Sequence, residues 1–494
     1  MGIYGGIIPV ASAKKIAIFH KNYKENVFGP DGGKPDIDNL PPPLYIEDGR
    51  GKSRLDPGKR MVLMAGENKK KTVLQSLRGL RGNARVAVFH EPGWSIPYGL
   101  YSFYLSLYMK SQGVTDVQIG FLISLNFIVG TIAALFAGAA ADKIGRRKTV
   151  LIFGMFGWVG SVLLNLFACN FWMFALAQGV CAVSKISDVA WQLTFIEDSD
   201  DEQRLAAFNL FGIIDILAGF LTPIAGVLVA NLGLVRAERS MLVFAAVCMS
   251  AIYIHRHIQY HETQMGRLAM ERSRSISYWE TLKNSLSQMK NALGSGNRRL
   301  RTVLAIVVLF NAYQPIGAYS SMYFAPYLTD VAGLDAAVIS VLGIVNSAFM
   351  LSVYLFAVPA MSRFNKLFSL TVGLGIQMVS MLSRMLLPKG SIAWAVVSVA
   401  LFSVGFGLCR PFLDALLAEA SPEEERSGVY ALKNTLISLA SALAGSLSGF
   451  LYRLNPKSIY LASLCLLALC ILFIFHYFHQ RQREERAALS GKRG

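Results

Sequence analysis

The sequence predicts an all-α, polytopic membrane protein with twelve transmembrane helices. Of the 494 residues, 53% are hydrophobic and only 16% are charged, and the mean hydropathy is +0.43. Soluble domains carry about 25% charged residues, whereas a membrane-spanning helix needs about 20 mainly apolar residues. Apolar segments of this length recur at approximately 94–110, 117–139, 149–168, 171–195, 205–230, 240–257, 302–328, 336–360, 367–387, 392–417, 427–451 and 458–478.

The predicted spans divide into two groups of six. Residues 1–90 are polar and predict a cytoplasmic, mostly disordered extension. An N-terminal bundle at 91–257 and a C-terminal bundle at 302–478 follow, separated by a cytoplasmic central loop at 258–301, and a basic cytoplasmic tail occupies 479–494. Apolar residues recur in the central loop at steps of three and four, which predicts a surface-lying amphipathic helix. These residues are Trp279, Leu282, Leu286, Met289 and Leu293.

The basic residues indicate the orientation of the chain. The net charge is +17, but the lysines and arginines lie between apolar segments, which argues against a nucleic-acid-binding surface. The loop after span two, the central loop and the C-terminal tail carry most of them, and the opposite loops carry fewer, such as Lys110 and Arg384. By the positive-inside rule, both termini are cytoplasmic, and we expect a plasma (inner) membrane location.

Two acidic segments indicate an internal duplication. Residues 197–204 follow span four and 419–426 follow span ten, and both run from a glutamate to an arginine across several acidic residues. Their positions differ by 222 at both ends. Two such halves are typical of secondary transporters, which alternate access around a site near the middle of the membrane.

The segment Gly138–Lys148, between spans two and three, carries the strongest local signal. A tight turn needs glycine where a side chain would clash, and Asp and Arg side chains can bond neighbouring helix ends. The segment resembles the loop signature of the major facilitator superfamily, which implies a conformational latch that holds the outward-facing state. The matching residues are Gly138, Asp142, Lys143, Gly145, Arg146 and Arg147. The corresponding loop of the second half, 359–366, lacks the acidic residue and both glycines, so we do not expect a symmetric second latch.

A second, partial resemblance lies in span five. Residues 219–226 resemble the Gly–Pro motif of proton-coupled drug antiporters in the same superfamily, although Thr222 and Val227 replace two of its glycines. The alternative is a simple kink at Pro223 with small residues that pack closely.

Six charged residues lie inside the predicted spans. Each costs about 2.5–3.5 kcal/mol at a lipid-facing helix centre, so we expect them to face the interior. Two interpretations are open: ion pairs that fix helix rotation, or proton coupling through Asp188, Asp215 or Asp414. The six are Lys185, Asp188, Asp215, Arg410, Asp414 and Lys433.

Polar and aromatic residues of spans one and seven are the candidates for a substrate cavity. The resemblance implies that these two spans line the cavity, and hydroxyl groups and aromatic faces suit a neutral or cationic organic substrate. The candidates are Tyr101, Asn311, Tyr313 and Gln314.

Taken together, these features predict secondary active transport of a small organic solute by alternating access, coupled to protons. The chain has no Gly-rich phosphate loop ending in Gly-Lys-Ser/Thr, which argues against an ATP-driven pump. We expect a monomer in the lipid bilayer, no enzymatic activity, no cofactor, no metal site and no nucleic-acid partner. Drug or metabolite efflux by antiport is favoured. The alternatives are an uptake symporter for a sugar or similar solute, and a non-transporting sensor or scaffold.

Overall fold

The computed structural model describes residues 45–48, 51–54, 77–273, 280, 283, 287, 290, 298–421 and 426–490. The chain forms two compact units, 8–79 and 1–7 with 80–494. In the smaller unit, strands β1 (Tyr45–Asp48) and β2 (Gly51–Arg54) pair antiparallel, with Tyr45 opposite Arg54. The sequence analysis did not anticipate these strands. The five apolar positions of the expected central-loop helix lie outside the described residues.

The larger unit is helical. Its first part contains α4 (Gly82–His90), α5 (Pro92–Ser111), α6 (Asp116–Ile144), α7 (Arg146–Gly154), η2 (Met155–Val159), α8 (Gly160–Phe167), α9 (Phe171–Ile196), α10 (Asp201–Gly219), α11 (Thr222–Leu232), α12 (Leu234–Gln259) and α13 (Gln264–Ser273).

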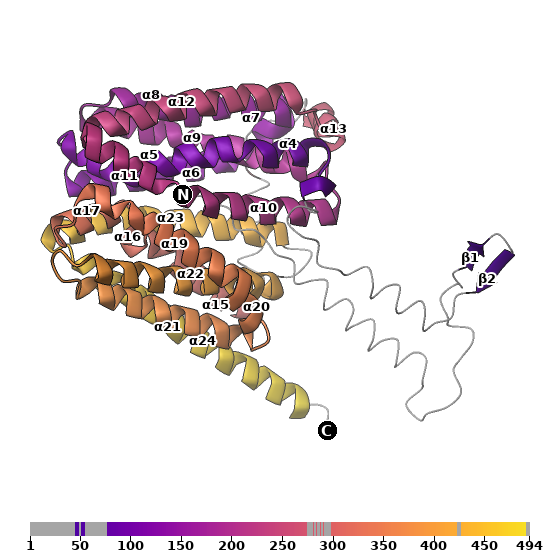
Figure 1. The fold of residues 1–494 in the computed structure, drawn as a ribbon. Coiled ribbons are helices and arrows are strands. Elements are labelled where there is room, and N and C mark those ends of the chain that lie inside the picture. The colour runs from indigo at the N-terminus through magenta and orange to yellow at the C-terminus, as the bar shows by residue number, and fades with distance from the viewer. Residues whose placement is uncertain are drawn as a thin grey trace. The chain divides into compact units, whose positions relative to one another are not determined.

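Its second part begins at Arg298. It contains α15 (Arg298–Ala312), α16 (Gln314–Gly317), α17 (Phe324–Asp330), α18 (Ala336–Ile339), α19 (Val341–Ser352), η3 (Val353–Ala357), α20 (Val358–Met361), α21 (Lys366–Met385), α22 (Ile392–Ala420), α23 (Arg426–Leu454) and α24 (Ser458–Ser490). In Figure 1 the helices of the first part, indigo to magenta, form one group, and those of the second part, orange to yellow, form another. We call these groups the N half and the C half.

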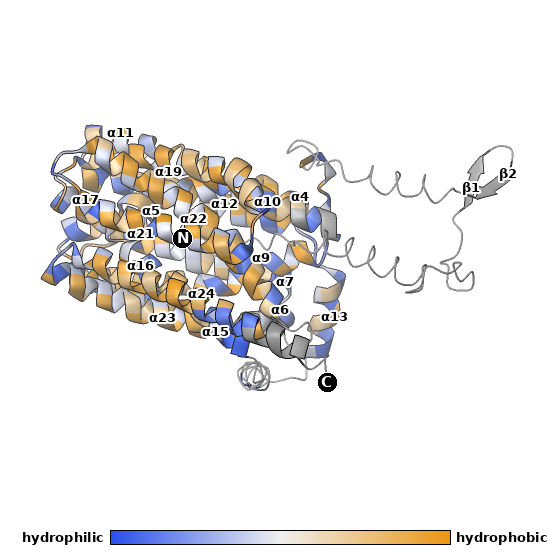
Figure 2. Ribbon diagram, turned by 90° about the horizontal axis from the view of Figure 1, so that it is seen from below, coloured by the Kyte–Doolittle hydropathy of each residue, from blue (hydrophilic) through white to orange (hydrophobic). Residues whose placement is uncertain are grey.

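Eleven helices of the described residues are long and apolar enough to cross a membrane, and they correspond to predicted spans two to twelve. The first predicted span forms α5, which falls outside this set because serine, tyrosine and glycine residues lower its hydropathy. Helix α5 nevertheless packs against α10, α11 and α12. The structure therefore confirms an all-α membrane protein. Together with α5, which corresponds to predicted span one, the eleven helices account for the twelve predicted spans. Figure 2 shows hydrophobic residues along the helices and hydrophilic ones near α13 and the start of α15.

Helix α4 lies inside the segment that the sequence assigned to the N-terminal extension. Its second residue, Asn83, is buried, and its backbone N–H donates to Asp198 Oδ2 at 2.8 Å. Its side-chain amide donates to the His261 carbonyl at 3.0 Å. Immediately after α4, Glu91 forms a buried ion pair with Arg256 of α12, at 2.9 Å. The helical body therefore begins near residue 82, before the first strongly apolar stretch.

Span five is broken between α10 and α11, at the segment with the Gly–Pro resemblance. Pro223 lies in the first turn of α11, where its missing N–H costs no helical hydrogen bond. The Thr222 hydroxyl donates to the Gly219 carbonyl at 2.8 Å and lies 3.0 Å from the Ser340 carbonyl of the C half. A Cβ on Gly343 would lie 1.9 Å from Thr222 Oγ1. The segment thus forms a kink and a close packing contact between the halves.

Helices α6 and α23 form the other close contact between the halves. A Cβ on Gly120 would lie 2.5 Å from the Gly445 carbonyl oxygen and 2.9 Å from Gly449 Cα. Small residues let the two backbones approach each other in this way. This contact is near the start of α6, whereas the Gly138–Lys148 segment lies at its end. We call the end of the helical body that contains the Gly138–Lys148 segment the motif-loop end. The other end, where Gly120 contacts α23, is the opposite end.

Candidate functional site

The motif loop, residues 138–148, joins α6 to α7 through Gly145. This glycine has φ +91° and ψ 150°, a conformation that is essentially restricted to glycine. A Cβ here would lie 2.8 Å from Glu262 Oε2 and 3.0 Å from Met270 Sδ. By contrast, a Cβ on Gly138 would meet nothing within 4 Å. The first motif glycine is therefore not required by packing in this conformation.

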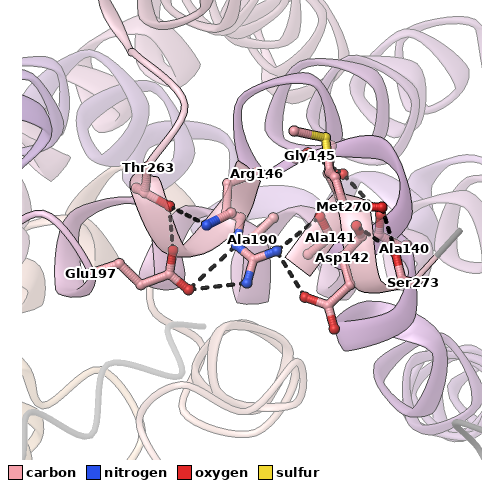
Figure 3. Close-up of polar contacts among 12 residues, drawn as sticks. Ala140, Ala141, Asp142, Gly145, Arg146, Ala190, Glu197, Thr263, Met270 and Ser273 are labelled. Atoms are coloured by element: carbon pink, nitrogen blue, oxygen red, sulfur yellow. Dashed lines mark hydrogen bonds and ion pairs between the residues drawn. The ribbon is translucent and has the colours of Figure 1, made fainter. Parts of the chain in front are cut away.

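Arg146 is the centre of the polar contacts around the motif loop (Figure 3). Although Arg146 is charged, the residue is only 5% exposed. Its Nη1 lies 2.7 Å from Asp142 Oδ1, and its Nη2 lies 3.0 Å from Glu197 Oε1 at the end of α9. The Thr263 hydroxyl donates to the other oxygen of Glu197. The guanidinium thus joins α6, α7 and α9 through charge-assisted hydrogen bonds.

Glu262, in the segment between α12 and α13, caps the N-terminus of α7. Its two carboxylate oxygens accept from the backbone N–H groups of Arg146 and Arg147, at 2.9 and 3.1 Å. The first N–H groups of a helix have no partner inside the helix, and its N-terminus favours negative charge. The Arg147 side chain also donates to the His257 carbonyl at 2.6 Å. Helices α12 and α13 are thereby connected to the motif loop.

The sequence analysis did not identify Glu197, Glu262 or Thr263 as site residues. Glu197 was noted only as part of the duplicated acidic segment, whose counterpart in the C half is Glu419. Glu419 lies 2.7 Å from Lys366, at the start of α21, so the C half retains one exposed ion pair without the glycines and aspartate of the motif loop. Lys143 is half-buried in the last turn of α6, where the helix dipole stabilises a positive charge.

In the N half, the structure brings Lys185 and Asp188 together within α9. The Lys185 ammonium lies 3.2 Å from Asp188 Oδ2, and the Trp158 indole N–H donates to Asp188 Oδ1 at 3.2 Å. The Trp158 ring is edge-on to Trp94, with centroids 4.9 Å apart. A cavity of about 10 Å³, roughly the size of one water molecule, lies among Trp94, Trp158, Ser187, Asp188, Trp191, Tyr253 and Arg256.

Asp215 is partly exposed in α10, within electrostatic range of Tyr98, as is Asp188. Its carboxylate makes no hydrogen bond or ion pair with another residue in the described part of the chain. At 1.5 Å rise per residue, Asp188 lies about 12 Å and Asp215 about 21 Å along their helices from the motif-loop end. Both aspartates therefore lie well inside the N half.

In the C half, Arg410 and Asp414 also approach each other, with 3.6 Å between Nε and Oδ2. Lys433 places its ammonium over the Tyr430 ring, 4.9 Å from the centroid. The side chains of Arg410 and Asp414 are about one-quarter exposed, like those of Lys185 and Asp188. The spacing of three or four residues thus brings both pairs together, while their role in proton coupling stays a prediction.

The four cavity candidates differ in their surroundings. Tyr101 is buried and lies edge-on to Tyr98, with centroids 5.6 Å apart. Tyr313 is also buried, and its hydroxyl donates to Gln377 at 3.2 Å within the C half. The Gln314 amide donates to Asn311 at 3.2 Å, and both residues are partly exposed. Of the four candidates, Asn311 and Gln314 are thus the two that are partly exposed in this conformation.

A charged network joins the two halves at the opposite end. The Lys110 ammonium, at the end of α5, lies 2.5 Å from Asp330 of the C half and 3.0 Å from Asp116. The Tyr452 hydroxyl donates to Asp330 at 3.0 Å, and the Tyr323 hydroxyl donates to the Asp116 carbonyl at 2.7 Å. We call these five residues the Lys110 network. The sequence analysis counted Lys110 only as a scattered loop charge.

Arg384 was also counted as a loop charge, but the structure buries it. It is 1% exposed, in the last turn of α21, and its Nη1 donates to the Gly317 carbonyl at 2.7 Å. Its guanidinium also lies within 6 Å of the rings of Phe324, Phe402 and Tyr460. Cation–π contacts of this kind stabilise a buried cation.

Comparisons with known proteins agree with this architecture. The family model described as Major Facilitator Superfamily matches residues 94–445 and 317–493. A tetracycline resistance protein, class H, of Pasteurella multocida is 21% identical over 385 residues, which cover 77% of this chain and 91% of that protein. A D-xylose transporter of Levilactobacillus brevis is 23% identical over 346 residues, covering 63% and 73%.

Solved structures show the same fold. A D-xylose-proton symporter has a TM-score of 0.62 at 14% identity, covering 79% of this chain and 97% of its own. A POT family transporter in complex with a thioalcohol-conjugated peptide has a TM-score of 0.61 at 13% identity, covering 83% and 99%.

Proposed function

Because the chain belongs to the major facilitator superfamily, we propose that it is a proton-coupled secondary transporter that moves a small organic solute by alternating access. The transporter consists of two six-helix bundles, 91–257 and 302–478, with an N-terminal extension, a central loop and a C-terminal tail. It acts as a monomer in the plasma membrane, with the motif loop and both termini cytoplasmic. The excess of basic residues at the motif-loop end supports this orientation.

The observation that carries the proposal is the placement of two polar clusters at the two ends of the helical body. The Lys110 network holds the halves together at the opposite end, and Arg146 holds the motif loop against α9 at the other end. A transporter needs contacts that close one end while the other opens. In this account, the Lys110 network closes the outer gate between the halves, and the Arg146 cluster, whose contacts lie within the N half, is the latch that rearranges in each cycle.

The coupling proton is assigned to the aspartates inside the spans. Asp188 and Asp414 each share an ion pair with a cation on the same helix, so protonation of either would release that cation. Asp215 is the third candidate. Asp188→Asn or Asp414→Asn should abolish substrate-dependent proton flux in proteoliposomes that contain a pH-sensitive dye. The exposed Glu271→Gln is the matched control, and full flux in both aspartate variants would refute the assignment.

Efflux of a drug or metabolite by antiport is the favoured direction. The relative named for tetracycline resistance supports it, as does the partial Gly–Pro motif around Pro223. The relative named as a D-xylose transporter supports the alternative of sugar uptake by symport. A third alternative is a sensor or scaffold that binds a solute without moving it.

One experiment separates these functions. Purified protein is first screened by thermal shift against sugars, amino acids and cationic drugs, and compounds that stabilise it are then tested for transport in proteoliposomes. Proton movement in the same direction as the solute indicates symport, and movement in the opposite direction indicates antiport. Stabilisation by a solute that is never transported would favour the sensor and contradict the proposal.

A further inference from the structure

Glu238 is a buried carboxylate in α12 that neither the motif loop nor the aspartates of the proposed coupling site involve. It lies four residues after the start of the helix, about 6 Å from the opposite end. The residue is 0% exposed, and neither carboxylate oxygen has a hydrogen-bond partner among the described residues. Burying an unpaired charge is very costly, and such a group instead stays neutral.

Arg384 provides a useful comparison at the same end of the C half. Both residues are fully buried and neither has a partner of opposite charge within the described chain, but their surroundings differ. Arg384 has the Gly317 carbonyl and three aromatic rings to stabilise its charge. No comparable group compensates Glu238. The described residues thus include a buried ionisable side chain with stabilising neighbours in the C half, Arg384, and one without such neighbours in the N half, Glu238.

The surroundings of Glu238 connect it to the contact between the halves. Helix α12 packs against α5, whose Tyr101 and Tyr104 lie within electrostatic range of Glu238. Helices α8 and α11, which also pack against α12, contain no ionisable residue. The adjacent Arg239 points to the Tyr108 hydroxyl, at 3.3 Å. Tyr104 is therefore the neighbour of Glu238 that reaches the other half.

Tyr104 is engaged with the C half in this conformation. Its hydroxyl donates to the Ala336 carbonyl, at the start of α18, at 2.6 Å. Opening of the opposite end must break this hydrogen bond, because α5 and α18 belong to different halves. The Tyr104 hydroxyl then no longer donates to Ala336 and is available to another acceptor.

We propose that Glu238 is a proton-binding residue whose protonation is linked, through Tyr104, to closure of the opposite end. While this end is closed, the carboxyl group keeps its proton. When the end opens, the O–H bond of Glu238 breaks, the proton passes to water, and the carboxylate accepts hydrogen bonds from Tyr104 and water. This inference deepens the proposed function by adding a proton site on the outer side of the cycle.

The sign of the pH dependence follows from this scheme. The closed state holds the proton and the open state loses it, so acidic conditions favour closure and alkaline conditions favour opening. For one linked proton, the ratio of open to closed molecules changes by at most about tenfold per pH unit. Protonation of Asp116 or Asp330 in the Lys110 network would act in the opposite direction, because it weakens an ion pair that holds this end closed.

The test measures opening directly and needs no substrate. Spin labels on Asn231 and Lys457, exposed positions of the two halves at this end, report their separation in reconstituted protein by pulsed electron spin resonance. In the parent protein, the open population should rise with pH. Glu238→Gln, which imitates the protonated form at nearly the same volume, should stay closed at every pH. The control Glu271→Gln should behave like the parent.

Tyr104→Phe provides a second variant that keeps the ring and the packing. It should open more readily at all pH values and respond less to pH, because it lacks both the bond to Ala336 and the donor to Glu238. If Glu238→Gln misfolds, this variant still tests the link. A Glu238→Gln variant with the parent's pH response would overturn the inference. Loss of that response without any proton-coupled transport in the parent would leave the inference intact and refute the proposed coupling.

Discussion

Arg146 is the residue on which the proposed latch depends most directly. Its guanidinium bridges Asp142 and Glu197; the side chains of Arg146 and Glu197 are almost fully buried, whereas that of Asp142 is 39% exposed. Removal of one partner from a buried ion pair costs about 3–5 kcal/mol, because the other charge stays buried and unpaired. We therefore expect Arg146→Ala to lower the free energy of unfolding by this amount, measured by denaturant or thermal unfolding in detergent.

Lys148 provides the control in the same loop. It is exposed, so Lys148→Ala should change the free energy of unfolding by no more than about 0.5 kcal/mol. Equal effects of the two substitutions would show that the loop acts only through its net positive charge.

The two motif glycines should respond to alanine in opposite ways. Gly145→Ala places a Cβ against Glu262 in a backbone conformation that costs a non-glycine residue about 1–3 kcal/mol. Gly138 lies inside α6 with open space around its Cβ, so alanine there should stabilise the protein by about 0.5–1 kcal/mol. Thermal unfolding of the two variants measures both effects, and a destabilising Gly138→Ala would contradict this assignment.

At the same scale, the sequence predicted the residues that interact along one helix. Lys185 with Asp188 and Arg410 with Asp414 follow from their spacing alone. Glu262 and Thr263 could not be found in this way, because their partners are brought together only by the packing of α12 and α13 against the motif loop. Arg384 was wrongly assigned to a loop. It lies at the end of an apolar segment, where the local sequence pattern is the same for a buried residue as for an exposed one.

At the scale of the element, the N-terminus of α7 depends on a carboxylate from another segment. Glu262→Gln removes the negative charge and one of the two acceptors, which should weaken the cap by about 0.3–1 kcal/mol, and by up to about 2 kcal/mol at a partly buried position. The amide hydrogens of Arg146 and Arg147 should then exchange faster with solvent. Hydrogen exchange measured by mass spectrometry tests this, with Glu271→Gln as the control. Unchanged exchange at these amides would contradict the capping role.

The element boundaries show where hydrophobicity is informative. Long apolar runs predicted α6, α9, α22 and α23 to within a few residues. The start of α4 at Gly82 was not predicted, because α4 is held by polar contacts of Asn83 and by the neighbouring Glu91–Arg256 pair rather than by an apolar run. The break after Gly219 agrees with the kink at Pro223 that the sequence offered as one interpretation of span five. The break after Ala312, which precedes Pro315 in the first turn of α16, was not predicted.

At the scale of the whole molecule, the Lys110 network should control closure of the opposite end. Lys110→Asp replaces attraction to Asp116 and Asp330 by repulsion, so this end should open. The double variant Lys110→Asp with Asp330→Lys restores one attractive pair across the halves and should close it again in part. The separation of spin labels at Asn231 and Lys457 measures the change. Equal separations in the single and double variants would show that the ion pair has no part in closure.

The family and the helical membrane fold followed from the sequence because hydrophobic runs, charge placement and one loop motif all agreed. The contact between Lys110 and Asp330 could not be predicted from the sequence, because the two residues lie 220 positions apart and only the packing of the two halves brings them together.

The central claim, that the two ends open in alternation, is tested most directly by measuring both ends in the same variant. A second spin-label pair at Lys148 and Arg363, exposed positions of the two halves at the motif-loop end, complements the pair at Asn231 and Lys457. We predict that Lys110→Asp lengthens the distance at the opposite end and shortens the distance at the motif-loop end. A longer distance at the opposite end with no change at the motif-loop end would contradict alternating access in this protein.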